Sequence, residues 1–502
     1  MAIKTIQINK FLTIGENKRN LPNGVLHYLE NVEVGTDNSV KQVLNVTTTD
    51  NDQCILKLIQ YNNIVYGLGF DNTTNKDVTL YKYDTNAYVA LTNGTVAGGT
   101  LRLYSPFLAV KDGYIYFDPG QNYIARYEIA TNTMSATWHA HNGGMLGGTL
   151  WQNKLWCWGD SDNYIYHIDG SDLVQGILIP TDQTIKDIIP YGDYLAILCT
   201  ASQTSNDGVS RMYLWDGSDT IFIDIVDIGY GEVSGGDVLD GIIYAGISFK
   251  NKKGFRLKAY TGGIFQTVYT YYGKKNEVSD YIYSFIASQL KAYTGYLYFM
   301  VVGARPGSSF ADVYEATIFR YGRKNADEPY GLSVYKSLEV EPAVGNTVGS
   351  VGNDFVIDEN DTYALSLNQN SIYAVVYEAS YKTRQVKSTA STFTAQPGVI
   401  ETSIFTGGDS HIQKKLIGVS TQCVPITSGQ SITLKYKADA ETTWTTFATI
   451  NTVGSISQET LNVEATGANL PQFKEIAFRA ELLGGAELTG ILIKYEEQIS
   501  TI

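Results

Sequence analysis

Between about residue 60 and residue 380 the chain repeats one short pattern, and this repeat limits the possible folds more than any other feature. The pattern is clearest where the turn pair Asp112-Gly113 leads into the aromatic stretch Tyr114–Phe117. A polar loop then leads into a second alternating stretch, Tyr123–Glu128. Apolar side chains recur with a period of two, which is the rhythm of a β-strand rather than a helix. Each unit therefore predicts two adjacent short strands.

Seven places in the sequence carry this unit, and one position near the end of each first stretch can be aligned. The aligned residues are Tyr66, Tyr116, Trp156, Ala196, Tyr244, Tyr298 and Tyr363. Successive members lie 40 to 65 residues apart. Repeats of this length, made of short strands and Gly/Asp/Asn turns, are the signature of propeller blades. We therefore expect an all-β chain with a β-propeller over residues 51–397, of seven blades.

The segments that flank or interrupt the repeat do not show its sequence pattern. We expect residues 1–50 to form an N-terminal arm, with residues 40–48 pairing with the last blade to close the ring, because a free strand edge needs a partner. The longest irregular insertion, residues 322–360, is predicted to cover one face or to contact a neighbouring subunit.

After residue 397 no blade pattern appears. Seven short alternating stretches occupy the last hundred residues: Val399–Phe405, Lys415–Val424, Ser431–Ala438, Thr443–Ile450, Gln458–Val463, Phe473–Leu482 and Leu488–Tyr495. This density of strands predicts a separate β-sandwich over residues 398–502 that buries its own core.

Composition excludes several classes of protein. The formal net charge of −14 and the pI of about 4.9 disfavour direct binding to nucleic acid and adsorption to anionic lipid. The four cysteines are scattered and form no CxxC pair, so neither a zinc ribbon nor a disulfide framework is predicted. No apolar run approaches the roughly 18 residues that cross a bilayer. We expect a soluble chain without an export signal or membrane insertion.

The N-terminal part contains the segment Gly15-Glu16-Asn17-Lys18-Arg19-Asn20-Leu21-Pro22, followed by Leu29-Glu30-Asn31-Val32-Glu33-Val34. These two segments resemble a pattern found in structural proteins of tailed bacteriophages. Many such proteins open with G-x-N-x-R…L-P…L-x-N-V-x-V and continue into a propeller. Family members continue with Gly-Ser and a doubly basic segment that ends in Gly. This chain departs from that pattern, with Asn38-Ser39-Val40-Lys41-Gln42-Val43.

The C-terminal part is also similar to such virion proteins. The segments that carry this likeness are Ser428–Tyr436, Thr442–Phe447, Phe473–Arg479 and Gly490–Tyr495. The resemblance covers about 150 residues outside the repeat. It implies a place in the virion, in the tail or the head-to-tail region, and it transfers no catalytic residue.

A few residues could in principle bind a metal ion. His139 and His141 lie two apart and would share a strand face, but no third ligand is evident nearby. Asp160 with Asp162, and Asp358 with Asp361, recur as in calcium loops but lack the Gly and Glu of an EF-hand. Surface or turn residues are the simpler interpretation, and we predict no metal and no cofactor.

Trp156 and Trp158 also lie two apart and would share a strand face. Exposed rings could stack on a sugar, whereas packing between blades needs the same large rings, and we favour packing. Trp151, at an odd offset from Trp156, need not join them.

No GxSxG, Walker loop, HExxH or Cys–His signature is present, so we predict no enzymatic activity and nominate no catalytic residue. The sequence favours a non-catalytic virion structural protein that is made in the host cytoplasm. Its expected partners are other virion proteins, in a homo-oligomer or a symmetric ring. The alternative is a module at the virion surface that binds a receptor or a host-surface glycan.

Overall fold

A computed structural model describes most of residues 3–498, and every regular element in the described part is a β-strand. The residues outside the description are 1–2, 9–10, 12, 15–24, 31, 35–38, 43–46, 51–52, 72–76, 85–86, 99–106, 121, 142, 160–161, 171, 203–206, 219, 250–253, 272–281, 286–289, 305–314, 324–329, 340–350, 358–362, 369–382, 388–396, 408–409, 462–470 and 499–502. Among the described residues, none belongs to a helix long and apolar enough to cross a membrane.

The chain forms two compact units. One contains residues 46–316 and 340–389, and the other contains residues 1–45, 317–339 and 390–502. The chain therefore passes between the units several times, whereas the sequence suggested three consecutive domains, 1–50, 51–397 and 398–502.

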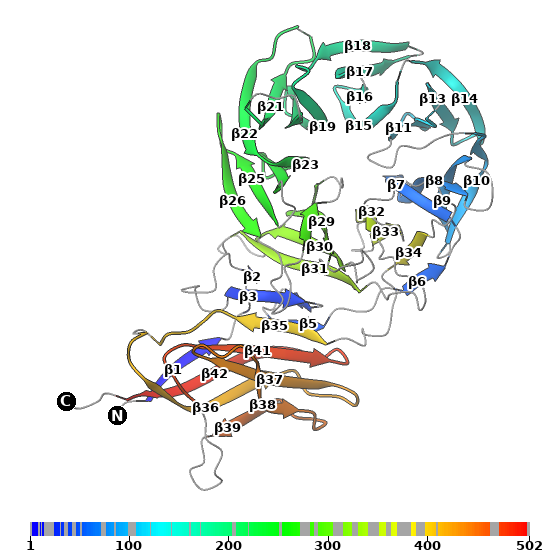
Figure 1. Ribbon diagram of the computed structural model, residues 1–502. Coiled ribbons are helices and arrows are strands. Elements are labelled where there is room, and N and C mark those ends of the chain that lie inside the picture. Colours follow the sequence, from blue (N-terminus) through cyan, green and yellow to red (C-terminus); the bar gives the residue numbers. More distant parts are fainter. Residues whose placement is uncertain are drawn as a thin grey trace. The chain divides into compact units, whose positions relative to one another are not determined.

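The first unit contains six complete four-stranded sheets in the described residues, each with its strands antiparallel (Figure 1). Their strands, from first to fourth along each sheet, are β7 (Gln53–Tyr61), β8 (Ile64–Asp71), β9 (Val78–Asp84) and β10 (Ala87–Val96); β11 (Leu108–Lys111), β12 (Tyr114–Phe117), β13 (Tyr123–Glu128) and β14 (Thr133–Ala140); β15 (Met145–Trp151), β16 (Lys154–Gly159), β17 (Tyr164–Asp169) and β18 (Asp172–Leu178); β19 (Gln183–Tyr191), β20 (Tyr194–Ala201), β21 (Val209–Trp215) and β22 (Asp224–Tyr230); β23 (Glu232–Leu239), β24 (Ile242–Ser248), β25 (Phe255–Tyr260) and β26 (Phe265–Tyr271); β32 (Val351–Ile357), β33 (Tyr363–Asn368), β34 (Thr383–Lys387) and β6 (Thr47–Asp50).

The first strands of these sheets meet in a closed ring. β7 contacts β11, which contacts β15, and the series continues through β19 to β23. β28 (Lys291–Tyr293) contacts β23, and it pairs with β29 (Tyr296–Ala304), as does β27 (Ile282–Phe285). β29 contacts β32, and β32 contacts β7. A closed ring of radial antiparallel sheets is a β-propeller, as the sequence predicted.

The hairpins between first and second strands follow from their turn residues. Most of these turns have two central residues, both with positive φ, as in Asn62-Asn63, Asp112-Gly113 and Asp240-Gly241. Such type I′ turns match the right-handed twist of the paired strands. They place Tyr66, Tyr116, Trp156, Ala196, Tyr244 and Tyr298 each third in its second strand.

The predicted equivalence is wrong for Tyr363. This residue begins β33, and Leu365 is third and pairs with Phe355. Tyr363 therefore stands two positions earlier in its strand than the aligned residues do in the other sheets.

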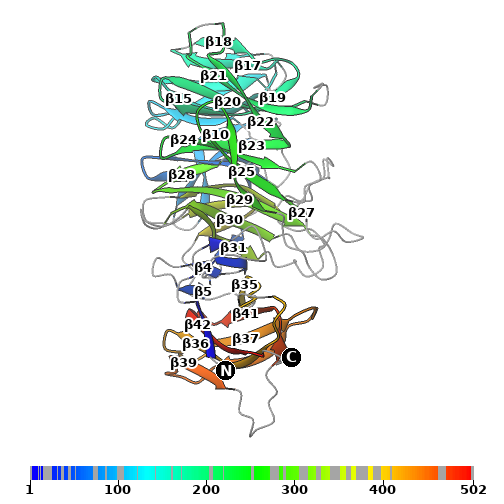
Figure 2. The same ribbon diagram turned by 90° about the vertical axis from the view of Figure 1, so that its left-hand side faces the viewer.

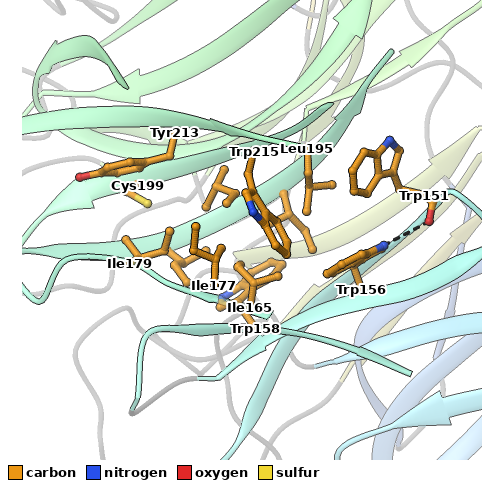
Figure 3. Packing of buried hydrophobic residues seen from close by; sticks show 13 residues of the cluster. Trp151, Trp156, Trp158, Ile165, Ile177, Ile179, Leu195, Cys199, Tyr213 and Trp215 are labelled. Carbon is orange, nitrogen blue, oxygen red and sulfur yellow. Dashed lines mark hydrogen bonds between the residues drawn. The ribbon is translucent and has the colours of Figure 1, made fainter. Parts of the chain in front are cut away.

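Large apolar side chains fill the spaces between consecutive sheets. Between β15–β18 and β19–β22, the rings of Trp151, Trp156, Trp158, Tyr213 and Trp215 pack with isoleucine and leucine side chains (Figure 3). The thiols of Cys157, Cys199 and Cys423 are reduced and buried.

A strand from the N-terminal side completes the last sheet, as predicted, but it overlaps the predicted segment only at Thr47 and Thr48. β6 (Thr47–Asp50) pairs with β34, from Thr47 opposite Lys387 to Asp50 opposite Arg384. The predicted segment was 40–48. Its first part instead forms β5 (Val40–Gln42), which pairs with β4 and β42 in the other unit.

The second unit contains two sheets. The strands of the first are β1 (Ile3–Ile8), β4 (Val32–Val34), β5, β36 (Lys414–Cys423), β39 (Ser457–Leu461), β40 (Gln472–Phe473) and β42 (Glu487–Glu497). The second sheet has eleven strands, and those that lie in this unit are β2 (Thr13–Ile14), β3 (Val25–Glu30), most of β30 (Glu315–Gly322), β31 (Gly331–Glu339), β35 (Gly398–Thr402), β37 (Ser431–Ala438), β38 (Thr445–Ile450) and β41 (Ile476–Leu483). Six of the seven strands expected after residue 397 are present with ends shifted by a few residues. The seventh, Phe473–Leu482, is divided between β40 and β41, which belong to different sheets.

The N-terminal strands pair directly with C-terminal ones. β1 runs antiparallel to β42, from Ile3 opposite Glu496 to Ile8 opposite Ile491, and β3 pairs with β35. In Figure 1, β1, drawn in blue, lies beside the red β42, and β3, also blue, lies beside the yellow β35; Figure 2 shows the same strands from the side. Residues 1–45 are therefore part of this unit and do not form a separate arm. Likewise, the insertion at 322–360 is not simply irregular, because it contains β31 and β32.

Candidate functional site

Three aspartates lie on the first strands of propeller sheets: Asp187 on β19 and Asp354 on β32 are buried, and Asp237 on β23 is half-buried. Asp187 and Asp354 stand where the pairing of the first two strands shifts register. Each carboxylate accepts a hydrogen bond from the amide of the residue that follows it, at 2.7–2.9 Å. Each aspartate thereby fixes the backbone conformation at its own position in the strand.

The second oxygen of each carboxylate reaches the next sheet of the ring. Asp187 accepts from the amide of Gly236 on β23 at 3.0 Å, and Asp237 accepts from the amide of Ala292 on β28 at 2.6 Å. Asp354 accepts from the amide of Leu58 on β7 at 2.9 Å. The same device thus joins consecutive first strands at three places.

Asp354 differs from the other two aspartates because its carboxylate pairs with the ammonium groups of two lysines. Nζ of Lys291 lies 2.8 Å from one carboxylate oxygen and also donates to the carbonyl of Phe355. Nζ of Lys57 lies 3.5 Å from the other oxygen. The side chain of Asp354 is fully buried, and that of Lys57 is 7% exposed. Charges this far from water persist only when they are paired.

Burial and charge act in opposite directions on these groups. Burial raises the pKa of Asp187 to about 7, although the hydrogen bond from Gly236 and the charge of Lys57 oppose the rise. Burial would also raise the pKa of Asp354, but Lys291 and Lys57 together hold it below the ordinary value. The pKa of Lys57 is lowered by burial, and Asp354 offsets this only in part.

These groups suit the joining of strands rather than a reaction. Both oxygens of each carboxylate are held by backbone amides or lysines, so neither is presented to a bound molecule. Within the described residues, no group of three or more His, Cys, Asp or Glu side chains is arranged to hold a metal ion.

The histidines considered as metal ligands have separate surroundings. His139 lies on β14 next to Trp138, with ring centroids 5.8 Å apart. His141 instead has its Nε2 3.8 Å from a carboxylate oxygen of buried Asp118. That same oxygen accepts the amide of Met145, so Asp118 holds the start of the next sheet.

The calcium-like aspartates also have a local role where they are described. Asp162 accepts hydrogen bonds from the amide of Tyr164 and the hydroxyl of Tyr166, which fixes the turn before β17. Asp160, Asp358 and Asp361 lie outside the described residues.

The tryptophans form core and not a sugar platform. Trp156 and Trp158 are 1% and 2% exposed, so neither ring can be reached by a ligand. Trp151 joins the same cluster, with its ring centroid 5.6 Å from that of Trp156, and its carbonyl accepts the indole N–H of Trp156 (Figure 3). Packing between sheets, the favoured interpretation, is therefore confirmed.

A half-buried arginine on the β11–β14 sheet lies among aromatic rings. The guanidinium carbon of Arg126 is 4.5 Å from the ring centroid of Tyr114 and 5.4 Å from that of Trp138. Trp138 stands in an outer-strand bulge opposite Ala125, and its ring meets Tyr116 edge to face. The two nearby rings restrict the orientation of the guanidinium, whose planar shape favours bidentate contact with a carboxylate.

Sequence reasoning missed the buried charges on the first strands. A local signal does exist, because each aspartate is followed by two apolar residues at the end of a first strand: Asp187-Ile188-Ile189, Asp237-Val238-Leu239 and Asp354-Phe355-Val356. Among 51 acidic residues this pattern becomes visible only once the strands are known.

No protein-family model matches the sequence, and no curated protein matches it. Similar solved structures include the computationally designed Ika8 protein, at 12% identity over 75% of this chain and 99% of that chain, with a TM-score of 0.38. The β-propeller domain of Cps50 (Swd1) from Myceliophteria thermophila has 10% identity over 68% and 99%, with a TM-score of 0.42. The WD40 β-propeller domain of Doa1 has 11% identity over 69% and 96%, also with a TM-score of 0.42. Likenesses with TM-scores this low support no conclusion about this chain. The assignment of a β-propeller depends on the sheet topology and on the closed ring of first strands.

Proposed function

We propose that this chain is a non-catalytic structural protein of a tailed bacteriophage virion, associated with the tail and in contact with neighbouring subunits in a symmetric assembly. In this proposal the propeller has seven blades, with β28 and β29 in the blade that follows β23–β26. The two sheets of the other unit form a β-sandwich.

One observation carries the proposal most directly. The segments that resemble phage virion proteins come from opposite ends of the sequence, yet they belong to one unit. The stretch Leu29–Val34 supplies parts of β3 and β4, and Gly490–Tyr495 lies in β42. β3 pairs with β35, and β5 pairs with both β4 and β42. Two separate likenesses thus describe one structural module, as expected if both come from the same kind of protein.

The propeller offers surface for a neighbouring subunit. Ile221, Ile223 and Ile225 alternate along the outermost strand of the β19–β22 sheet and the residues before it, and they are 72%, 54% and 53% exposed. Three large apolar side chains in one outward row suit burial against another protein. A standard interface buries on the order of 1,200–2,000 Å².

Deletion of residues 390–502 from the phage gene tests this role. The proposal predicts particles that fail to complete, and complementation with the full-length chain restores them. Complete, infectious particles without this segment would contradict it. Turnover of a polysaccharide by the purified chain would reject the non-catalytic part.

A receptor-binding or glycan-binding module at the virion surface is the second candidate, and Arg126 favours it. A guanidinium packed near the rings of Tyr114 and Trp138 suits an acidic sugar, whose carboxylate would meet the guanidinium edge. A glycan array with wild type, Arg126→Gln and Arg211→Gln separates the candidates. Arg211 is a matched control because it is already paired with three aspartates, Asp182, Asp207 and Asp227. This candidate predicts binding that only the Arg126 variant loses, and no binding by wild type would reject it.

A further inference from the structure

A propeller has one junction that chain continuity does not hold closed. Here it lies between the sheet that begins with β7 and the sheet that begins with β32, because the strands of these sheets come from opposite ends of the propeller sequence. Leu58 and Asp354, which meet there, are 296 residues apart in the chain. Holding such distant segments together costs conformational entropy that local contacts elsewhere in the ring do not face.

Two sets of contacts span this junction, at opposite edges of the last sheet. At the outer edge β6, which precedes β7 in the chain, pairs with β34. At the inner edge Asp354 accepts the amide of Leu58 and binds Lys57 on β7, while Lys291 reaches it from β28.

Comparison of the three aspartates shows what is particular to this place. Asp187 and Asp237 join sheets that follow one another directly in the chain, and both accept their hydrogen bonds from backbone amides. The charges of Lys57 and Lys291 also act on Asp187 and Asp237, respectively, without forming a hydrogen-bonded ion pair. Asp354 makes the same two amide contacts and adds two lysines from two different sheets. The extra charge pairing therefore occurs at the junction that needs it, and it ties three sheets together.

We propose that Asp354, Lys57 and Lys291 form an inner clasp that locks the closure of the propeller ring, in addition to the outer strand β6. The clasp works because its members satisfy one another where little water reaches: the side chains of Asp354 and Lys57 are buried, and that of Lys291 is 26% exposed. Separating β7 from β32 would leave an ammonium or a carboxylate unpaired until solvent enters, and this raises the cost of opening.

Amide hydrogen exchange on the full-length chain, read by mass spectrometry, tests the clasp. The variants are Lys57→Met, Lys291→Met and Asp354→Asn, and the matched control is Asp237→Asn. We expect each clasp variant to raise exchange at least tenfold in peptides from β7 and β32. Peptides from β20 and β24 should keep wild-type exchange. The control should leave β7 and β32 protected.

The same variants also distinguish a local effect of the clasp from a general loss of stability. If Asp354→Asn fails to fold, Lys57→Met decides, since Asp354 then keeps its contact with Lys291. In the double variant Lys57→Met/Asp354→Asn, the increase in exchange at β7 should be smaller than the product of the two single increases, because the two groups act as one unit. Unchanged exchange, a uniform increase over all sheets, or opening of β7 and β32 in the control would each overturn the proposal.

Discussion

At the scale of single residues, close packing between sheets decides which substitutions the propeller tolerates. Gly147 shows this most sharply, because it has a φ of +50° and faces the indole of Trp158. A Cβ placed on Gly147 would lie 1.8 Å from Cη2 of Trp158. The other sides of the Trp158 ring are packed by the cluster in Figure 3, so a movement of the ring away from Gly147 would disturb that packing.

Gly147→Ala should therefore destabilise the chain by about 3 kcal/mol, through overpacking and a strained left-handed backbone. Gly113→Ala is the control, since Gly113 has a φ of +80° but open space around the added Cβ. It should cost only about 1 kcal/mol. Chemical denaturation of the three proteins measures both values, and equal losses would contradict the packing argument.

The buried carboxyl of Asp187 should make stability depend on pH. Its pKa is about 7 in the folded chain against an ordinary value of 3.8, so between these values the folded state holds a proton that the unfolded state has lost. This group's contribution to stability is complete below about pH 4 and is lost as the pH rises through 7, with a slope of at most about 1.4 kcal/mol per pH unit. Lys57 and Asp237 are the charged groups that act on it.

Asp187→Asn should remove that decline. We expect the difference in unfolding free energy between wild type and variant to fall from pH 5 to pH 7 and to level off above pH 8. Denaturant titrations at several pH values measure it. A difference that stays flat over this range would show that Asp187 titrates in its ordinary range, and one that rises with pH would contradict a raised pKa.

At the scale of elements, the sequence pattern predicted those features that residues close together in the chain determine. Turn pairs such as Asn62-Asn63 and Asp112-Gly113 determine hairpins, and the alternation around them determines strands, so both could be predicted from the sequence. Partners of distant strands could not. Nothing in Ile3–Ile8 indicates that it pairs with β42, because this pairing depends on which sheet edge remains open. The burial of Asp187, Lys57 and Asp354 was hidden for the same reason, since it comes from neighbouring sheets.

This pairing has a direct consequence for fragments. Residues 390–502 alone would lack β1, β3 and β5, which pair with β42 and β35, and open edges favour aggregation. Contrary to the prediction from sequence, residues 398–502 do not complete their sheets by themselves. A synthetic peptide of residues 1–45 should bind the fragment and raise its melting temperature.

The peptide with Ile8→Asp is the matched control, because Ile8 is buried against this unit and an aspartate there would be unpaired. It should bind at least tenfold more weakly, as isothermal calorimetry would show. Equal binding by both peptides, or a fragment whose stability the peptide does not change, would count against the role of the N-terminal strands.

At the scale of the whole molecule, the chain combines a closed ring with a unit built from both ends of the sequence. The ring is held by aspartate contacts between first strands, and its surface carries an outward apolar row. These features suit a rigid component that is bound by its neighbours, which is the central claim.

Cryo-electron microscopy of intact phage particles tests that claim most directly. The account predicts density for the propeller and for the two-sheet unit at a fixed, symmetry-related position in the tail region, with residues Ile221, Ile223 and Ile225 in or beside a subunit interface. Purified infectious particles that contain no copy of this chain, confirmed by mass spectrometry of their proteins, would contradict it.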